Sequence, residues 1–467
     1  MDAISKDRPA PSPEGAGDPP WPAARTAWFA MGVLSLVRLS AQLDLGILSL
    51  LVEPIKHDLH LSDGQVGLLL GFAFALFYVV LGVPLAALVD RWSRRMILFC
   101  GVIVWSLMTA MTGLAQNFVQ LFLCRVGVGA GESVNGPATY SLISDLFPRE
   151  RLPRAIAVLN LGSMAGLGLS LVLGAVVIHA LSSITMPVLP VVGQVRHWQL
   201  VFFLVGLPGL LLALLLLAVG EPIRRGRAAV LLAQAAGEKP QRMSFAAVVS
   251  HLLRHWRLFL PMFLGLALSA IESGGTAMWR PAFFQRTYGW TPQQAGMATG
   301  IAQIIAAPIG LFIGAWLSER LARTRDDANL RVVVIGWGLA IPFVIAGPLM
   351  PSADLAVLCG AMSIICSMMG TPTQNAALQS VTPNMMRGQI TALYLLTYTL
   401  AAQGIGPSFI AAVTEFGMRD EGALRYSLAA SAAVMMPLAL LVMLWGLKPY
   451  GREISRLKAL EAEQATA

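Results

Sequence analysis

The residues of this sequence with the clearest capacity for chemistry are charged side chains inside long apolar runs. Asp44, Arg125 and Glu132 each stand in a stretch that is otherwise almost free of charge. A charge at the centre of a bilayer costs about 2.5–3.5 kcal/mol or more, so each of these residues is a candidate functional residue. Arg125 and Glu132 are seven residues apart, which places them on one helix face, about 10 Å apart along the axis.

A carboxyl group held between apolar neighbours and an arginine can load and release a proton when its access to water changes. We therefore predict that Asp44 and Glu132 carry protons. Arg125 is predicted to bind an anionic group or to gate the two carboxylates. A static buried ion pair is the alternative interpretation.

The elements that must position these charges are membrane-spanning helices. The chain of 467 residues is 56% hydrophobic and only 12% charged, whereas a soluble domain is about 25% charged. Crossing the hydrocarbon core of a bilayer takes about 20 apolar residues in a helix. The sequence therefore predicts an all-α membrane protein with 12 transmembrane helices in two six-helix bundles, at roughly 27–51, 65–89, 96–115, 118–143, 152–180, 198–219, 257–280, 293–317, 330–350, 354–379, 388–414 and 424–447.

The two halves of the chain are related in sequence. Residues 65–91 align without a gap on residues 294–320, and the matched positions include Gly71 and Gly300. Each segment opens with a predicted capping box, Ser62-x-x-Gln65 and Thr291-x-x-Gln294. Parallel six-helix halves with a site between them are a transporter architecture. The predicted order is a disordered N-terminal tail (1–25), an N-terminal bundle (26–220), a cytoplasmic central loop (221–256), a C-terminal bundle (257–447) and a cytoplasmic tail (448–467).

Glu272 is the acidic residue of the second half that corresponds to Asp44. It lies within one residue of the position that the repeat offset of 229 assigns. The following Ser273-Gly274-Gly275 predicts a break in the helix. We expect Glu272 to line the substrate cavity. Its partner region in the tenth span, residues 371–375, is polar but uncharged. Aromatic walls are predicted from Trp279, Phe283, Tyr394 and Tyr398.

The basic residues predict the orientation in the membrane. With a cytoplasmic N-terminus, 25 of the 33 lysines and arginines fall on cytoplasmic segments and 6 fall on the opposite side. Bases collect on cytoplasmic loops, so we expect a multi-pass protein of the cell inner membrane with both termini in the cytoplasm. The same rule accounts for the net charge of +8, and nucleic-acid binding is not expected.

Other classes of protein find little support in the sequence. It contains no paired-histidine metal motif, phosphate-binding loop or nucleophile elbow in a suitable context, so neither an enzyme nor a cofactor or metal is expected. A membrane receptor that does not transport remains an open alternative. The expected partners are a small-molecule or lipid substrate, protons and the lipid bilayer, and the expected state is a monomer.

The junction between the second and third spans carries the pattern Ala86-x-x-x-Asp90-Arg91-Trp92-Ser93-Arg94-Arg95. It resembles the signature loop of the major facilitator superfamily, with Ala86 and Ser93 where glycines are usual. In that superfamily spans 1, 4, 7 and 10 line the pathway, so the resemblance implies that Asp44 faces the same cavity as Arg125 and Glu132. Asp90 can cap a neighbouring helix. The resemblance implies that Arg94 pairs with Asp145 and that this pair is a latch, which holds the outward-facing state and breaks when the cytoplasmic side opens. The predicted latch residues are Asp90, Arg91, Arg94, Arg95 and Asp145.

Further segments resemble bacterial spinster-like transporters over nearly the whole chain. They are Asp44 with 51–56, 71–78, 125–132 and 279–289. The resemblance implies alternating access, proton coupling and a sphingolipid- or lysophospholipid-like substrate. Symport of a small organic anion, such as an aromatic acid, and drug/proton antiport are the alternatives.

One departure from the family concerns the first span. The family has an Asp-Arg pair where this chain has Asp44-Leu45. Arg38 lies seven residues before Leu45, on nearly the same helix face. We therefore predict that Arg38 supplies the missing positive charge for substrate binding.

Overall fold

The computed structural model describes residues 21–148, 150–183, 188–189, 193–224 and 244–466. Within them the chain forms two helical halves. The N-terminal half consists of α1 (Ala24–Leu50), α2 (Val52–Leu59), α3 (Asp63–Gly67), η1 (Leu68–Phe72), α4 (Ala73–Arg91), α5 (Arg94–Thr112), α6 (Phe118–Glu132), α7 (Asn135–Leu146), α8 (Leu152–Ser182), the short strands β1 (Val188–Leu189) and β2 (Gly193–Gln194), and α9 (His197–Leu217).

The C-terminal half follows the same plan. It consists of α11 (Phe245–Arg254), α12 (Trp256–Tyr288), α13 (Pro292–Ala322), α14 (Ala328–Ala346), η2 (Gly347–Leu349), α15 (Ala353–Met368), α16 (Gly370–Val381), α17 (Arg387–Thr399), η3 (Leu400–Ile405), α18 (Gly406–Ala412), η4 (Val413–Met418), η5 (Glu421–Ala423) and α19 (Leu424–Thr466).

Several of these helices join end to end, so that each half contains six long rods. Examples are α6 with α7, which are interrupted only at Ser133–Val134, and α15 with α16. Among the described residues, nine helices are long and apolar enough to cross a membrane. The six rods in each half confirm the expected all-α fold with 12 helices in two bundles. The segment expected as a C-terminal tail is helical, because α19 continues through Lys448 to Thr466.

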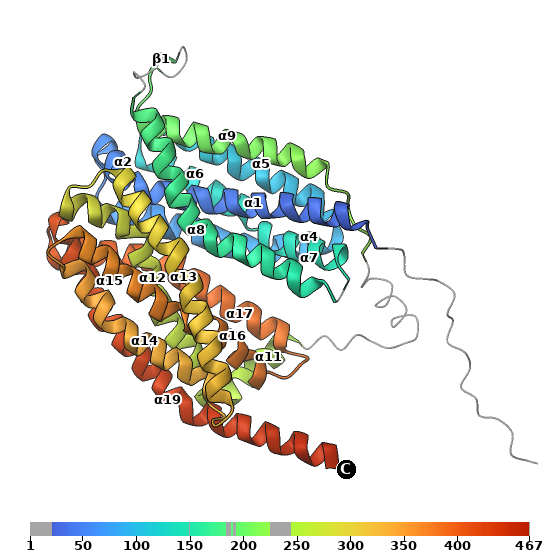
Figure 1. Ribbon diagram of the computed structural model, residues 1–467. Helices are drawn as coiled ribbons and strands as arrows, with labels where there is room; N and C mark the ends of the chain where they lie inside the picture. The colour runs from blue at the N-terminus through green and yellow to red at the C-terminus, as the bar shows by residue number, and fades with distance from the viewer. Residues whose placement is uncertain (1–20, 149, 184–187, 190–192, 225–243, 467) are drawn as a thin grey trace, which may run out of the picture.

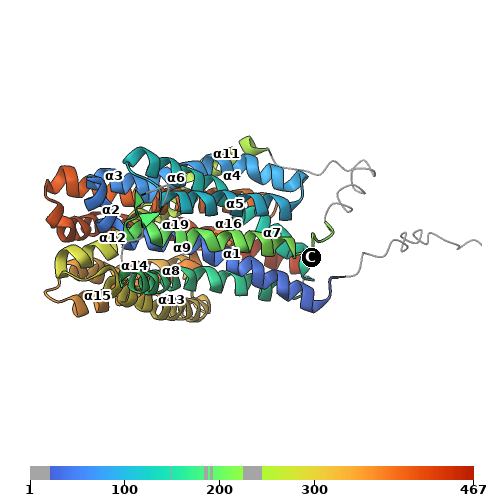
Figure 2. The same cartoon turned by 90° about the horizontal axis from the view of Figure 1, so that it is seen from above.

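Both ends of the described chain lie at one end of the bundle, which we call the terminal end; the opposite end, with α2 and the α12–α13 turn, is the distal end (Figures 1 and 2). The predicted capping boxes begin two rods at the distal end. The Ser62 and Thr291 side chains accept the backbone N–H groups of Gln65 and Gln294, and the glutamine side chains accept the cap N–H groups in return. These bonds satisfy amides that a helix start leaves open.

The halves meet through close backbone contacts in their distal parts. Helix α8 packs against α13, while α3 and η1 pack against α18 and η3. Gly168 of α8 and Gly300 of α13 face each other so closely that a Cβ on Gly300 would lie 2.6 Å from the Gly168 carbonyl oxygen. A Cβ on Gly71 would lie 2.7 Å from the carbonyl oxygens of Gln403 and Gly404. The distal seal between the halves therefore depends on glycines.

Candidate functional site

Asp44 and Arg125 form a buried ion pair inside the N-terminal half. The Arg125 Nη1 donates to Asp44 Oδ2, and the Thr109 hydroxyl donates to Asp44 Oδ1 at 2.9 Å. The guanidinium also lies 5.6 Å from the centre of the Phe74 ring. Both charged residues are almost completely buried. The structure therefore brings together the acid of α1 and the base of α6 that the sequence predicts as partners.

Glu132 lies seven residues after Arg125, at the end of α6. It is buried at 5% exposure, and within the described part of the chain its Oε1 has no hydrogen-bond partner. The charges of Asp44, Arg125 and Arg38 all act on it electrostatically. Arg125 Nη2 also has no partner among the described residues. The site thus contains one acid that is fully paired and a second acid with an open oxygen.

A cavity of about 340 Å³ lies mainly in the C-terminal half. Glu272 of α12 lines it, as expected, and accepts a hydrogen bond from Thr276 at 3.0 Å. Other lining residues from the two halves are Gln42, Leu167, Leu266, Ser269, Ser273, Gln303, Ala307, Trp337, Ser367, Met368, Thr371, Gln374, Asn375, Tyr394, Leu395, Tyr398 and Met436. Eleven of the 18 lining residues are polar.

Several expected cavity residues lie elsewhere. Asp44 is absent from the lining of this cavity, because its face of α1 meets α5 and α6 inside the N-terminal half. The expectation that Asp44 faces the cavity is therefore wrong for this structure. Trp279 and Phe283 also do not form its wall: both are buried, and the Trp279 indole donates to the Pro407 carbonyl at 2.9 Å. Tyr394 and Tyr398 do line it.

The signature loop is part of a charge cluster at the terminal end. Arg94 is 1% exposed; its Nη1 donates to Asp145, its Nε to Glu221 at 2.9 Å, and its Nη2 to the Pro222 carbonyl at 2.8 Å. Arg95 donates to the carbonyls of Leu217 and Val219 at the end of α9. Ser93 caps α5. The Arg94–Asp145 pair implied by the resemblance is thus confirmed.

The latch role of this cluster stays a prediction. Arg94 and Asp145 both belong to the N-terminal half, so their pair does not itself join the halves. Arg91 is exposed, and the Asp90 side chain lies outside the described part of the chain. Glu221 was not identified from the sequence. Burial alone would raise its pKa, but hydrogen bonds from Ser93, the Arg95 backbone and Arg94 outweigh burial and lower the pKa.

A second charge cluster, also not identified from the sequence, joins the two halves at the distal end. Arg286 of α12 holds both Asp63 oxygens at 2.8 Å and Glu53 at 2.7 Å. Lys56 bridges Asp63 at 2.6 Å and Glu421 at 2.5 Å. We call these five residues the distal ion cluster. The sequence signal for the distal ion cluster is the presence of charged residues beside the span ends of both halves.

Comparisons with known proteins agree with this architecture. A family model described as the Major Facilitator Superfamily matches residues 34–407. An MFS-type efflux pump of Mycolicibacterium smegmatis is 28% identical over 403 residues, which cover 85% of this chain and 87% of that protein. Protein spinster of Drosophila melanogaster is 23% identical over 340 residues, which cover 71% of this chain and 51% of that protein.

A solved structure shows the same fold. The crystal structure of a bacterial homolog to the human lysosomal transporter Spinster, in an inward-facing and unoccupied conformation, superposes with a TM-score of 0.74 at 24% identity. The match covers 93% of this chain and 98% of that chain.

Proposed function

Because the chain belongs to the Major Facilitator Superfamily, and so is a multi-pass membrane transporter rather than an enzyme, we propose that it is a proton-coupled secondary active transporter. It works by alternating access and moves an amphipathic, lipid-like organic substrate. The spinster-like resemblance of its sequence and fold supports this proposal. The cavity supports it too, because polar groups and the two tyrosines Tyr394 and Tyr398 share its wall.

The observation that carries proton coupling is the pairing state of the two N-terminal acids. Asp44 is held by Arg125 and Thr109, whereas buried Glu132 has an oxygen without a partner in the described part of the chain. An unpaired buried charge is costly, and binding a proton removes that cost. Glu132 is the proton carrier in this proposal, and Arg125 can switch between the two acids through its open Nη2.

The proposed orientation places the terminal end in the cytoplasm of a cell with an inner membrane. The excess of bases in the segments at the terminal end supports this. The halves are joined at the distal end by the distal ion cluster, so the conformation described here is the inward-facing one in this proposal. The Arg94–Asp145 pair is intact in this conformation, which argues against a latch that breaks when the cytoplasmic side opens.

Symport of a small organic anion is the second candidate function. The cavity of about 340 Å³ is compact, and eleven of its 18 lining residues are polar. A cavity of this volume with several polar side chains in its wall can hold a small polar molecule as well as an acyl chain. Drug/proton antiport is the third candidate, supported by the similarity to an efflux pump.

Proton flux in liposomes tests the proposal. Purified protein is reconstituted with a pH-sensitive dye inside, and lysophospholipids, sphingoid bases and aromatic acids are added in turn. We expect substrate-dependent proton movement in wild type that is lost in Asp44→Asn and Glu132→Gln. The matched control is Glu453→Gln, which removes a surface pair with Arg456 and a longer-range effect on His251, both away from Asp44 and Glu132.

The opposite result is equally clear. If substrate crosses the membrane unchanged in both variants and no proton moves, the protein is a uniporter. Asp44 and Glu132 are then structural charges.

A further inference from the structure

Arg280 is an intramembrane cation that the proposed mechanism does not use. The sequence places it at the outer end of a span, but α12 continues to Tyr288. Arg280 is therefore eight residues inside the helix, about 12 Å from its distal end. A cation at that depth needs a partner of opposite charge or a polar cavity.

The face of α12 that carries Arg280 is the face that lines the cavity. Ser269 and Ser273 line the cavity of about 340 Å³, and Ala277 and Arg280 line a small cavity of about 10 Å³ just beyond it. Steps of four, four and three residues keep these side chains on one helix face. Leu167 and Gln303 line both cavities. The small cavity is thus the distal continuation of the large one.

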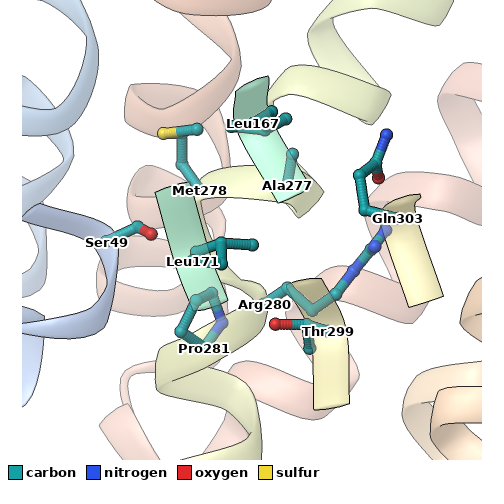
Figure 3. Close-up of a pocket in the computed structure, with 9 residues that line it drawn as sticks. All are labelled: Ser49, Leu167, Leu171, Ala277, Met278, Arg280, Pro281, Thr299 and Gln303. Carbon is teal, nitrogen blue, oxygen red and sulfur yellow. The ribbon is translucent and has the colours of Figure 1, made fainter. Parts of the chain in front are cut away.

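The Arg280 guanidinium is available to a ligand. Among the residues that the structure describes, it forms no hydrogen bond or ion pair. Glu272, eight residues earlier on α12, acts on it only through longer-range electrostatics. Figure 3 shows the Arg280 side chain extending toward Gln303, which also has no hydrogen-bond partner among the described residues.

The other polar groups of the small cavity do not compete for this role. The Ser49 hydroxyl donates to the Gly46 carbonyl at 2.7 Å, and the Thr299 hydroxyl donates to the Ala295 carbonyl at 2.5 Å. The donors left for a ligand are therefore Arg280 and the Gln303 amide. Both suit a carboxylate, phosphate or sulfate, and a guanidinium can bind such a group through two parallel hydrogen bonds.

We propose that Arg280, assisted by Gln303, binds an anionic group of the transported molecule at the distal end of the central cavity. The small cavity has room for about one water, so the body of the substrate lies in the larger cavity and only its charged end reaches Arg280. This assigns the anion-binding role to Arg280 instead of Arg125, which Asp44 occupies. The inference rests on the proposed function in one respect, namely that this cavity carries the substrate.

The experiment measures binding to purified protein in detergent, with no proton gradient. The probes are lysophosphatidylglycerol, which is an anionic amphiphile, 4-hydroxybenzoate, which is a small anion, and sphingosine, which is a cationic amphiphile. We expect wild type to bind at least one anionic probe more tightly than sphingosine. Arg280→Gln should weaken that binding by about 10- to 100-fold, the effect of losing a charged hydrogen bond, and should leave sphingosine binding unchanged.

Two further variants complete the design. Arg280→Lys keeps the positive charge but loses the two parallel N–H donors of the guanidinium, and it should bind the anionic probe with intermediate affinity. Arg425→Gln is the matched control, because Arg425 donates only to the carbonyls of Pro348 and Met350 near the distal end; it should bind as wild type does. Which anionic probe responds distinguishes a lipid headgroup from a free organic anion.

Two results overturn the inference: Arg280→Gln binds the anionic probes as tightly as wild type, or wild type binds none of them more tightly than sphingosine. Proton movement in liposomes is scored separately. Anion binding that depends on Arg280, without proton movement, upholds this inference and refutes proton coupling. Proton movement together with unaltered anion binding in Arg280→Gln refutes this inference and upholds proton coupling.

Discussion

Replacement of Arg286 by glutamine should open the distal end. Arg286 belongs to the C-terminal half, and its partners Asp63 and Glu53 belong to the N-terminal half. In the proposed alternating-access mechanism the halves separate at this end, so these contacts would exist only while the distal end is closed. Their loss therefore shifts the equilibrium between the two conformations as well as the stability of the fold.

The burial of the partners sets the size of the shift. Asp63 is fully buried, while Glu53 is 30% exposed. Removing one member of a buried ion pair costs about 3–5 kcal/mol, and a partly exposed pair contributes at most about 1 kcal/mol. Lys56 remains bonded to Asp63, so we take the lower bound of about 3 kcal/mol. That corresponds to a change of about 100-fold in the ratio of closed to open molecules.

Distances between spin labels can measure this change. Cysteines at His57 of α2 and Phe416 of η4 would carry the labels, in a variant whose four native cysteines are replaced. Both positions are exposed, and they lie in different halves. We expect Arg286→Gln to enlarge the fraction of long distances, and Arg425→Gln to leave the distribution as in wild type. Identical distributions in all three proteins would refute the idea that the distal ion cluster holds the halves together.

Two further predictions concern the glycine contacts and the terminal charge cluster. Gly300→Ala should disfavour distal closure, because the new Cβ would lie 2.6 Å from the Gly168 carbonyl oxygen and overpacking costs about 1–3 kcal/mol. The same pair of spin labels measures this change. The control is Gly360→Ala, whose new Cβ would meet no atom within 4 Å. Glu221→Gln should lower the melting temperature in detergent at pH 7, and the difference from wild type should shrink as the pH falls below the ordinary glutamate value of 4.5. Folding lowers the pKa of Glu221, so its carboxylate stabilises the fold at pH values above the pKa in the unfolded chain, and this stabilisation is lost when the carboxylate is protonated. A difference in melting temperature that stays constant between pH 7 and pH 3 would contradict the prediction.

Features encoded by neighbouring residues could be predicted from the sequence. The capping boxes at Ser62 and Thr291 depend on residues three apart, and both form as expected. The six-plus-six arrangement follows from the lengths of the apolar runs. The Arg94–Asp145 pair was accessible because a family motif points to it.

Features that depend on how helices rotate against one another could not be predicted. The spacing of residues shows that Asp44 shares a helix face with other residues, but not which neighbour that face meets. In the structure it meets Thr109 and Arg125 rather than the cavity. Glu221 binds Arg94 across 127 positions of sequence, and nothing local to either residue indicates that contact.

Arg280 shows how a span boundary can hide a candidate functional residue. The expected span ends at residue 280, so Arg280 is counted with the bases on the non-cytoplasmic side. The helix tolerates Pro281 and runs on to Tyr288, which places Arg280 about two turns inside the helix. An error of eight residues in the end of one helix thus changes a loop base into a candidate ligand-binding group.

The charges inside the membrane also have an electrical consequence. The three acids and three bases described above balance when all are ionised: Asp44, Glu132 and Glu272 against Arg38, Arg125 and Arg280. A carrier that is neutral inside the bilayer can reorient without moving net charge through the transmembrane voltage. One added proton would break that balance, at up to about 2.3 kcal/mol per 100 mV, whereas a proton together with a monoanion would preserve it. Transport of a monoanion with one proton would therefore be driven by the pH gradient and would be indifferent to the voltage.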